Sequence, residues 1–117
     1  MTPPIATLFE IVDSADWQRL DEVFHPDIVY ERPGYPPFTG IAAVRLFYSD
    51  IRQIDAGRHE MEGLVITDSA AACWGTFRGV LKNGSESVER FADAYVLSHE
   101  SSPRVLWRRS HFFRAAI

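Results

Sequence analysis

The sequence predicts an α+β domain in which helices come first and a long antiparallel sheet follows. Three observations predict it. Apolar residues recur at helical spacing in the first half of the chain, alternating segments fill the second half, and an Asn-Gly turn joins two of those segments. Helices and strands segregated in this way are typical of α+β folds, so we expect the helices to cover one face of the sheet.

Length and composition limit the class of protein. The 117 residues, 46% of them hydrophobic, match one globular domain over residues 1–117. No uncharged run of about 18 residues exists that would span a membrane. The net charge of -4 disfavours binding to nucleic acid. Cys73 is the only cysteine, and the N-terminal segment lacks the basic start of a secretory signal, so we expect a cytoplasmic protein.

Two helices are expected before residue 27. The first begins near Pro3 or Pro4 and carries one apolar stripe formed by Ile5, Leu8, Phe9 and Val12. The second begins after Asp16, a good N-cap, and ends at His25-Pro26. Its buried residues would be Trp17, Leu20 and Phe24.

A short strand and a third helix follow. Residues 27–32 alternate in polarity and include β-branched side chains, and a proline-rich turn comes directly after them. Thr39 is expected to cap the third helix, which ends near Ala56-Gly57. Its apolar side would consist of Ile41, Val44, Phe47, Tyr48, Ile51 and Ile54.

The rest of the chain predicts strands at residues 58–67, 70–82, 86–98 and 104–114, which gives the element order ααβαββββ. Asn83-Gly84 favours a two-residue type I′ hairpin turn, because both residues accept positive φ angles. That turn fixes which residues of the two strands lie opposite one another. The expected cross-strand pairs are Arg78 with Glu89, Thr76 with Phe91, Trp74 with Asp93, and Ala72 with Tyr95. All eight side chains would then share one face of the sheet.

Asp93 is the first candidate catalytic residue. The expected register surrounds its carboxylate with Trp74, Phe91 and Tyr95, where desolvation would raise the pKa of Asp93. A neutral carboxylic acid in an apolar pocket acts as a general acid or donates a hydrogen bond to an oxyanion. The alternative is a structural role, in which Asp93 hydrogen bonds a buried hydroxyl, amide or arginine.

Arg32 is the second candidate, because it ends the first strand with the inward phase of Tyr30 and precedes the proline-rich turn. Its planar guanidinium would hold a substrate carboxylate or enolate oxygen. The alternative is a structural role, in which Arg32 forms an ion pair with Asp93 or remains solvated at the rim. Ser110 and Phe112 share the pocket-facing phase of the last strand, whereas His111 has the opposite phase and would point to the other side of the sheet.

Other kinds of chemistry lack a motif. The four histidines show no metal-binding spacing, and neither Ser110 nor Cys73 has the context of a nucleophile. No glycine-rich phosphate loop is present. We therefore expect neither a metal nor a cofactor. The arginines between residues 104 and 114 are expected to be solvated or paired with carboxylates rather than to form a nucleic-acid patch.

Several segments resemble a known family. The stretch from Asp16-Trp17 to Arg32-Pro33, the segment Gly40-Ile41 to Tyr48, Phe91-Ala92-Asp93-Ala94-Tyr95 and Leu106 to Phe112 are similar to SnoaL-like and ketosteroid-isomerase-like proteins of the nuclear transport factor two-like superfamily. The resemblance spans nearly the whole chain. It implies a cystatin-like α+β roll, in which a cone-shaped curved antiparallel sheet wraps around three N-terminal helices, and commonly a homodimer.

The resemblance also implies site residues. Asp93 matches the oxyanion aspartate of the steroid isomerases, which are the standard example of a carboxylic acid kept neutral. Leu8 stands where those enzymes have a tyrosine, Arg32 stands where they have the base, and Ser110 replaces the second aspartate of the epoxide hydrolases. The steroid isomerase and epoxide hydrolase mechanisms therefore do not transfer to this chain.

Two hypotheses follow. In the first, the protein is a cofactor-independent isomerase, cyclase or dehydratase acting on a small hydrophobic metabolite, with Asp93 and Arg32 catalytic. The substrate would contact Tyr30, Trp74, Phe91, Tyr95, Ser110 and Phe112. In the second, it is a non-catalytic module for ligand binding or dimerisation, in which Arg32 and Asp93 neutralise each other. In both, we expect a homodimer formed through the outer face of the sheet.

Overall fold

The computed structural model describes residues 4–114, so Pro3, one of the two expected helix starts, lies outside it. The helices are α1 (Pro4–Asp13), the 3-10 helix η1 (Trp17–Glu22), α2 (Ile41–Leu46) and the π-helical turn η2 (Phe47–Ile51). The strands are β1 (Phe24–Glu31), β2 (Phe38–Thr39), β3 (Ile54–Ile66), β4 (Ala70–Leu81), β5 (Glu86–Leu97) and β6 (Val105–Phe112). The α+β class and the expected order are confirmed, with β2 added.

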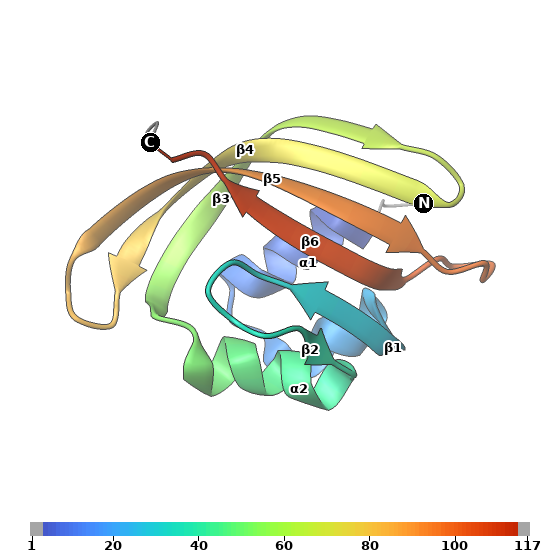
Figure 1. Cartoon of the computed structure of the whole chain (residues 1–117), viewed down its shortest axis with the longest axis horizontal. Helices are drawn as coiled ribbons and strands as arrows, with labels where there is room; N and C mark the ends of the chain where they lie inside the picture. The colour runs from blue at the N-terminus through green and yellow to red at the C-terminus, as the bar shows by residue number, and fades with distance from the viewer. Residues whose placement is uncertain (1–3, 115–117) are drawn as a thin grey trace.

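The six strands form one curved sheet in the order β2-β1-β6-β5-β4-β3. It wraps around the helices without closing, so β2 and β3 remain its edges (Figure 1). Neighbouring strands are antiparallel except β1 and β6, which run parallel. The expectation of a wholly antiparallel sheet is therefore wrong at this pair. A parallel pair needs a long connection, and here most of the chain lies between its two strands.

Helix α1 fills the hollow of the sheet, and its apolar stripe is confirmed. Ile5, Leu8, Phe9 and Val12 are all buried, and they form the centre of the core with residues from β1, β4 and β5 (Figure 1). Leu8 is completely buried in this stripe. No helix among the described residues has the length and apolar character needed to cross a membrane.

The other helical predictions need correction. The second helix is a 3-10 helix, and the side chain of Asp16 makes no capping hydrogen bond. The third helix stops at Ile51, and Ile54 belongs to β3 rather than to a helix. An apolar residue at position 54 fits both periodicities, and pairing decides the outcome. The Gln53 carbonyl accepts a hydrogen bond from Lys82, and Ile54 pairs with Leu81, which starts the strand early.

The register of the β4–β5 hairpin differs by one residue from the prediction. Cys73, not Trp74, lies opposite Asp93, and Trp74 lies opposite Ala92. The cause is the turn. Within this turn only Gly84 has a positive φ, of 88°. The Gly84 amide donates to the Leu81 carbonyl, and the Leu81 amide donates to the Ser85 carbonyl. This is a three-residue loop with a bulge rather than a two-residue type I′ turn.

This one-residue difference in register changes which side chains share a face, because side chains alternate along a strand. Of the eight residues predicted on one face, the four from β4 lie on the other face of the sheet. Glu89, Phe91, Asp93 and Tyr95 of β5 point inward as expected. Their expected partners on β4, Ala72, Trp74, Thr76 and Arg78, point outward. Trp74 is 46% exposed on the outer face.

We expect Gly84→Ala to lower the free energy of unfolding by about 1 kcal/mol, because a Cβ is strained at this positive φ. No neighbouring atom lies within 4 Å of such a Cβ, so the cost is one of backbone conformation alone. Urea denaturation measures the change. Ser85→Ala in the same loop is the matched control and should be neutral. Equal stability of Gly84→Ala and the wild type would contradict this description of the turn.

Candidate functional site

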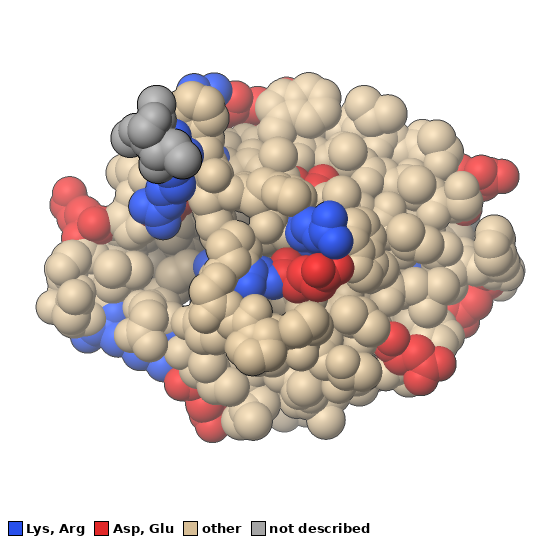
Figure 2. All heavy atoms as spheres, viewed as in Figure 1, with Lys and Arg blue, Asp and Glu red and all other residues tan. Residues whose placement is uncertain are grey.

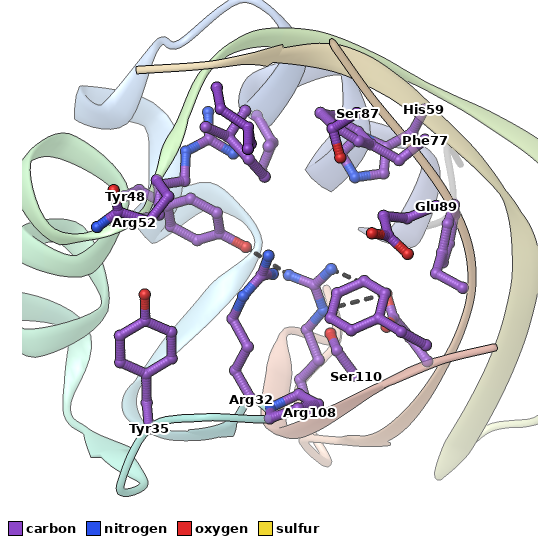
Figure 3. A pocket seen from close by; sticks show the side chains of 18 of the residues that line it. Arg32, Tyr35, Tyr48, Arg52, His59, Phe77, Ser87, Glu89, Arg108 and Ser110 are labelled. Atoms are coloured by element: carbon purple, nitrogen blue, oxygen red, sulfur yellow. Dashed lines mark hydrogen bonds and ion pairs between the residues drawn. The ribbon is translucent and has the colours of Figure 1, made fainter. Parts of the chain in front are cut away.

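A cavity of about 350 Å³ lies between the helices and the concave face of the sheet (Figure 3). Aromatic rings provide much of its wall, from Tyr35, Tyr48, Phe77, Phe91 and Phe112. Polar and charged wall residues are Arg32, Arg52, Gln53, His59, Ser87, Glu89, Asp93, Arg108, Ser110 and Arg114. This volume is at the small end of the range of about 300–1,000 Å³ for ligand pockets, which suits a small organic molecule.

The deepest polar feature is an ion pair between Asp93 on β5 and Arg108 on β6. Arg108 Nη2 and Nε donate to the same oxygen, Asp93 Oδ2, at 2.8 Å and 3.3 Å. The Tyr95 hydroxyl donates to it as well, at 3.0 Å. Both charged side chains are almost fully buried, with 1% and 4% of their surfaces exposed. The expected pairing of Asp93 with an arginine is therefore formed, but by Arg108 and not by Arg32.

This ion pair leaves one polar atom without a partner. Asp93 Oδ1 is buried and accepts no hydrogen bond from any described residue. Asp93 lines the cavity, and a hydroxyl group that reached this oxygen would satisfy it. Arg108 uses its remaining Nη1 to donate to the Tyr48 hydroxyl at 2.6 Å. Burial lowers the pKa of Arg108, but the Asp93 carboxylate and the hydroxyls of Tyr30, Tyr48 and Tyr95 together outweigh burial, and the pKa lies well above its ordinary value.

Arg32 stands beside Arg108 and belongs to a separate hydrogen-bond chain (Figure 3). Its Nη1 donates to the Tyr30 hydroxyl at 3.1 Å, and that hydroxyl lies 2.9 Å from Ser110 Oγ. Its guanidinium also packs over the rings of Phe47 and Phe112. Burial raises the pKa of Tyr30, but the cations of Arg108 and Arg32 outweigh burial and lower it.

A histidine that the sequence did not single out lines the cavity together with these arginines. His59 lies on β3, and its Nδ1 is 2.6 Å from Oδ1 of Asp13, the last residue of α1. The His59 backbone amide donates to the other carboxylate oxygen at 2.9 Å. A carboxylate is only an acceptor, so Nδ1 carries the hydrogen, and the Nε2 of a neutral ring is then a free base.

Aromatic rings fix the orientation of His59. The ring of Phe9 stacks on the imidazole at 4.6 Å between centroids, and Phe77 and Phe91 contact it at 4.9 Å and 5.3 Å. Burial lowers the pKa of His59, and the hydrogen bond to Asp13 offsets only part of this effect. The environment therefore favours the neutral imidazole. No local motif reveals this pair, because its residues are 46 positions apart.

Arg52 is a second residue that sequence reasoning missed. It follows η2, is 6% exposed, and places its guanidinium near the rings of Trp17 and Tyr48, at 5.1 Å and 5.3 Å. Its Nε is buried and has no hydrogen-bond partner among the described residues. An arginine at the end of a predicted helix resembles any solvated arginine in sequence, so no signal pointed to it.

The structure brings together five of the eight predicted site residues on the cavity wall: Arg32, Phe91, Asp93, Ser110 and Phe112. Tyr30 and Tyr95 lie behind this wall, where their hydroxyls hold Arg32 and Asp93. Trp74 lies on the opposite face of the sheet because of the one-residue slip, so it does not line this cavity. His111 is exposed on that outer face, as its phase predicted.

The other arginines near the C-terminus are paired with carboxylates, as expected. Arg104 pairs with Glu100 at 2.9 Å, Arg109 with Glu31 at 3.1 Å and Arg114 with Glu89 at 3.1 Å. On the face seen in Figure 2, acidic and basic side chains accordingly lie interspersed and do not form one large basic area.

Solved structures share this architecture. An NTF2-like protein of unknown function from Burkholderia pseudomallei K96243 has a TM-score of 0.80 and 18% identity, over 97% of this chain and 92% of that one. A putative SnoaL-like polyketide cyclase from Jannaschia sp. CCS1 has a TM-score of 0.77 and 12% identity, over 93% and 82%. TerC, crystallised with polyporic acid, has a TM-score of 0.79 and 14% identity, over 96% and 91%.

At these identities the solved structures establish the fold alone. The comparison with curated proteins found no match. The sequence model of the SnoaL-like domain matches residues 5–101, which include α1, most of the sheet and both His59 and Asp93. The resemblance expected from the sequence is thus confirmed, and the chain belongs to the SnoaL-like domain family.

Proposed function

We propose that this protein is a cofactor-independent enzyme that performs acid/base chemistry on a small hydrophobic metabolite. The observation that carries the proposal is the Asp13–His59 pair on the wall of an aromatic cavity. A histidine oriented by a carboxylate and kept neutral by burial is a suitable general base. The sequence had offered an acid candidate but no base, and His59 supplies one.

The arrangement suits removal of a proton from a carbon next to a carbonyl group. His59 Nε2 accepts the proton, and the electron pair moves to the carbonyl oxygen as an enolate. Arg32 is placed to stabilise this oxygen, because cationic donors on a dry cavity wall act strongly on developing charge. Asp93 Oδ1 accepts a hydrogen bond from a substrate hydroxyl. Isomerisation, ring closure and dehydration all proceed through such an enolate.

Two of the similar structures support this class of ligand and reaction. One is described as a putative polyketide cyclase, and another was crystallised with polyporic acid, a small organic molecule. We propose that the substrate of this chain is a small and largely apolar carbonyl compound.

We also propose a cytoplasmic location. Free Cys73 is buried, which fits a protein of the reducing cytoplasm.

The base is tested with nitrobenzisoxazole, a small aromatic probe whose ring opens when a base removes one C–H proton. His59 Nε2 takes the proton, the former C–H electrons form the nitrile, and the N–O bond breaks to give a coloured phenolate. We expect His59→Gln to slow this reaction at least about a hundredfold, because a general base contributes about 10²–10⁴-fold. Absorbance of the phenolate measures the rate.

The controls separate a base from a structural residue. His99→Gln changes an exposed histidine and should leave the rate unchanged. The wild-type kcat/KM should be independent of pH around neutrality, and its acidic limb should lie below the ordinary histidine pKa of about 6.5, since burial lowers the pKa of His59. His59→Gln should lose this acidic limb. Equal rates for folded His59→Gln and wild type would refute the proposal.

The alternative is a non-catalytic binding module, and the Asp93–Arg108 pair is the observation that favours it. The two groups neutralise each other inside the sheet, as that hypothesis required of Arg32 and Asp93. However, a pair that served only to neutralise two charges would be packed without open volume beside it, whereas the cavity opens directly next to both residues. We therefore assign the pair a supporting role and retain the enzyme as the favoured function.

If the pair is structural, Arg108→Met should lower the free energy of unfolding by about 3–5 kcal/mol, because it leaves a buried carboxylate without its cation. The double variant Arg108→Met with Asp93→Asn should recover part of this loss, because it no longer contains the unpaired carboxylate. Arg109→Met is the neighbouring control, since its pair with Glu31 is solvent-exposed and worth at most about 1 kcal/mol. Guanidinium denaturation provides the values. Equal effects of Arg108→Met and Arg109→Met would contradict the buried pair.

We also propose that a second copy of the chain covers the outer face of the sheet. Four exposed apolar side chains support this proposal: Val65, Trp74, Val96 and Phe113. Trp74→Glu should halve the mass measured by light scattering, whereas Ser101→Glu in a loop should leave the mass unchanged. A monomeric wild type would exclude the homodimer.

A further inference from the structure

We propose that the ligand of the cavity is a planar carboxylate, and that Arg52 binds its anionic group at the helical end of the cavity. This inference deepens the proposed function by naming the substrate class. It is based on the charges of the cavity wall and on a donor atom without a partner, and not on the catalytic role of His59.

Arg52 is a buried cation whose hydrogen-bonding capacity is not used up. Only 6% of the residue is exposed, yet it lines the cavity, and its Nε has no acceptor among the described residues. The rings of Trp17 and Tyr48 stabilise the positive charge but offer no acceptor to this N–H group at hydrogen-bonding distance. A buried donor without an acceptor is costly, and Arg52 borders the cavity, from which a ligand would supply the acceptor.

The charges on the cavity wall do not balance. Its charged side chains form two ion pairs, Arg108 with Asp93 and Arg114 with Glu89. Arg32 and Arg52 have no carboxylate partner within ion-pair distance in the described part of the chain. Because its environment favours a neutral His59, the partner Asp13 adds one uncompensated negative charge behind the wall. The wall residues together with Asp13 therefore have an excess of one positive charge.

An arginine cannot relieve this excess by losing its proton, because its pKa stays too high. Burial lowers the pKa of Arg52, and the nearby positive charge of Arg32 lowers it further, while Tyr48 acts in the opposite direction. Such a site gains from an anion. A carboxylate offers two acceptor oxygens in the plane of the guanidinium, which matches the geometry of Arg52.

The shape of the wall indicates what carries the carboxylate. Tyr48 stacks between Trp17 and Tyr30, at centroid distances of 5.2 Å and 6.3 Å, beside Arg52. Phe77, which Figure 3 shows across the cavity from Arg52, lines the same cavity together with Phe91 and Phe112. A cavity of about 350 Å³ with this many aromatic side chains in its wall favours an aromatic or conjugated molecule.

The test compares naphthoate with naphthamide, which has the same shape without the charge, by isothermal titration of the whole protein. We expect the wild type to bind naphthoate at least about tenfold more tightly, the usual size of a charge-assisted hydrogen bond. Arg52→Gln should abolish this preference and leave the naphthamide affinity unchanged, and Arg52→Lys should restore part of it. Arg58→Gln, an exposed arginine on β3, should behave as the wild type.

A measurement on the wild type covers the case in which Arg52→Gln does not fold. The Arg52 Nε–H resonance should shift with naphthoate and not with naphthamide. Equal affinities for the two probes, an unchanged resonance, or no binding of naphthoate at millimolar concentration would each overturn the proposal.

The two proposals fail independently. Preference for naphthoate without proton transfer that depends on His59 would support the anion site and refute the enzyme. Proton transfer that depends on His59 without any preference for the anion would refute the anion site and leave the enzyme in place.

Discussion

The buried ion pair between Asp93 and Arg108 holds the site together, because every polar group at its centre is arranged around it. The two residues lie on neighbouring strands, and the pair connects the middle of β5 to β6. Arg108 extends the connection to Tyr48 on η2, while Tyr95 closes the other side of Asp93. A sheet and a helical turn that are far apart in sequence are thereby fixed against each other around one cavity.

This arrangement explains why a small domain can keep an open space in its interior. Buried charges must be compensated by partners. The Arg108 guanidinium hydrogen bonds Asp93 and Tyr48 and packs over the ring of Tyr30, and these three contacts together hold it in one orientation. Rigid walls prevent the aromatic side chains from collapsing into the cavity. Two residues of the same wall each keep a buried polar atom without a hydrogen-bond partner among the described residues: the acceptor Asp93 Oδ1 and the donor Arg52 Nε.

The sequence predicted what depends on local periodicity. The stripe on α1, the inward face of β5 and the inward position of Arg32 follow from spacing within one element. The β4–β5 register was missed because Asn-Gly fits a two-residue turn and a three-residue turn alike, and only the backbone of Gly84 distinguishes them. Arg52 was missed because an arginine within a predicted helix looks like any solvated one, whereas Arg108 has the inward phase of Ser110 and Phe112, a signal that could have indicated it. The Asp13–His59 contact depends on how α1 docks against β3.

That contact makes Asp13 responsible for two properties at once. One of its oxygens accepts the amide of β3 and fastens the end of α1 to the edge of the sheet, and the other accepts Nδ1 of His59. A relative that needs only a docked first helix would therefore keep this aspartate for its contact with the β3 amide alone. Under the proposed role of His59, the residue at position 59 among relatives of this chain should thus be more informative about activity than the aspartate that orients it.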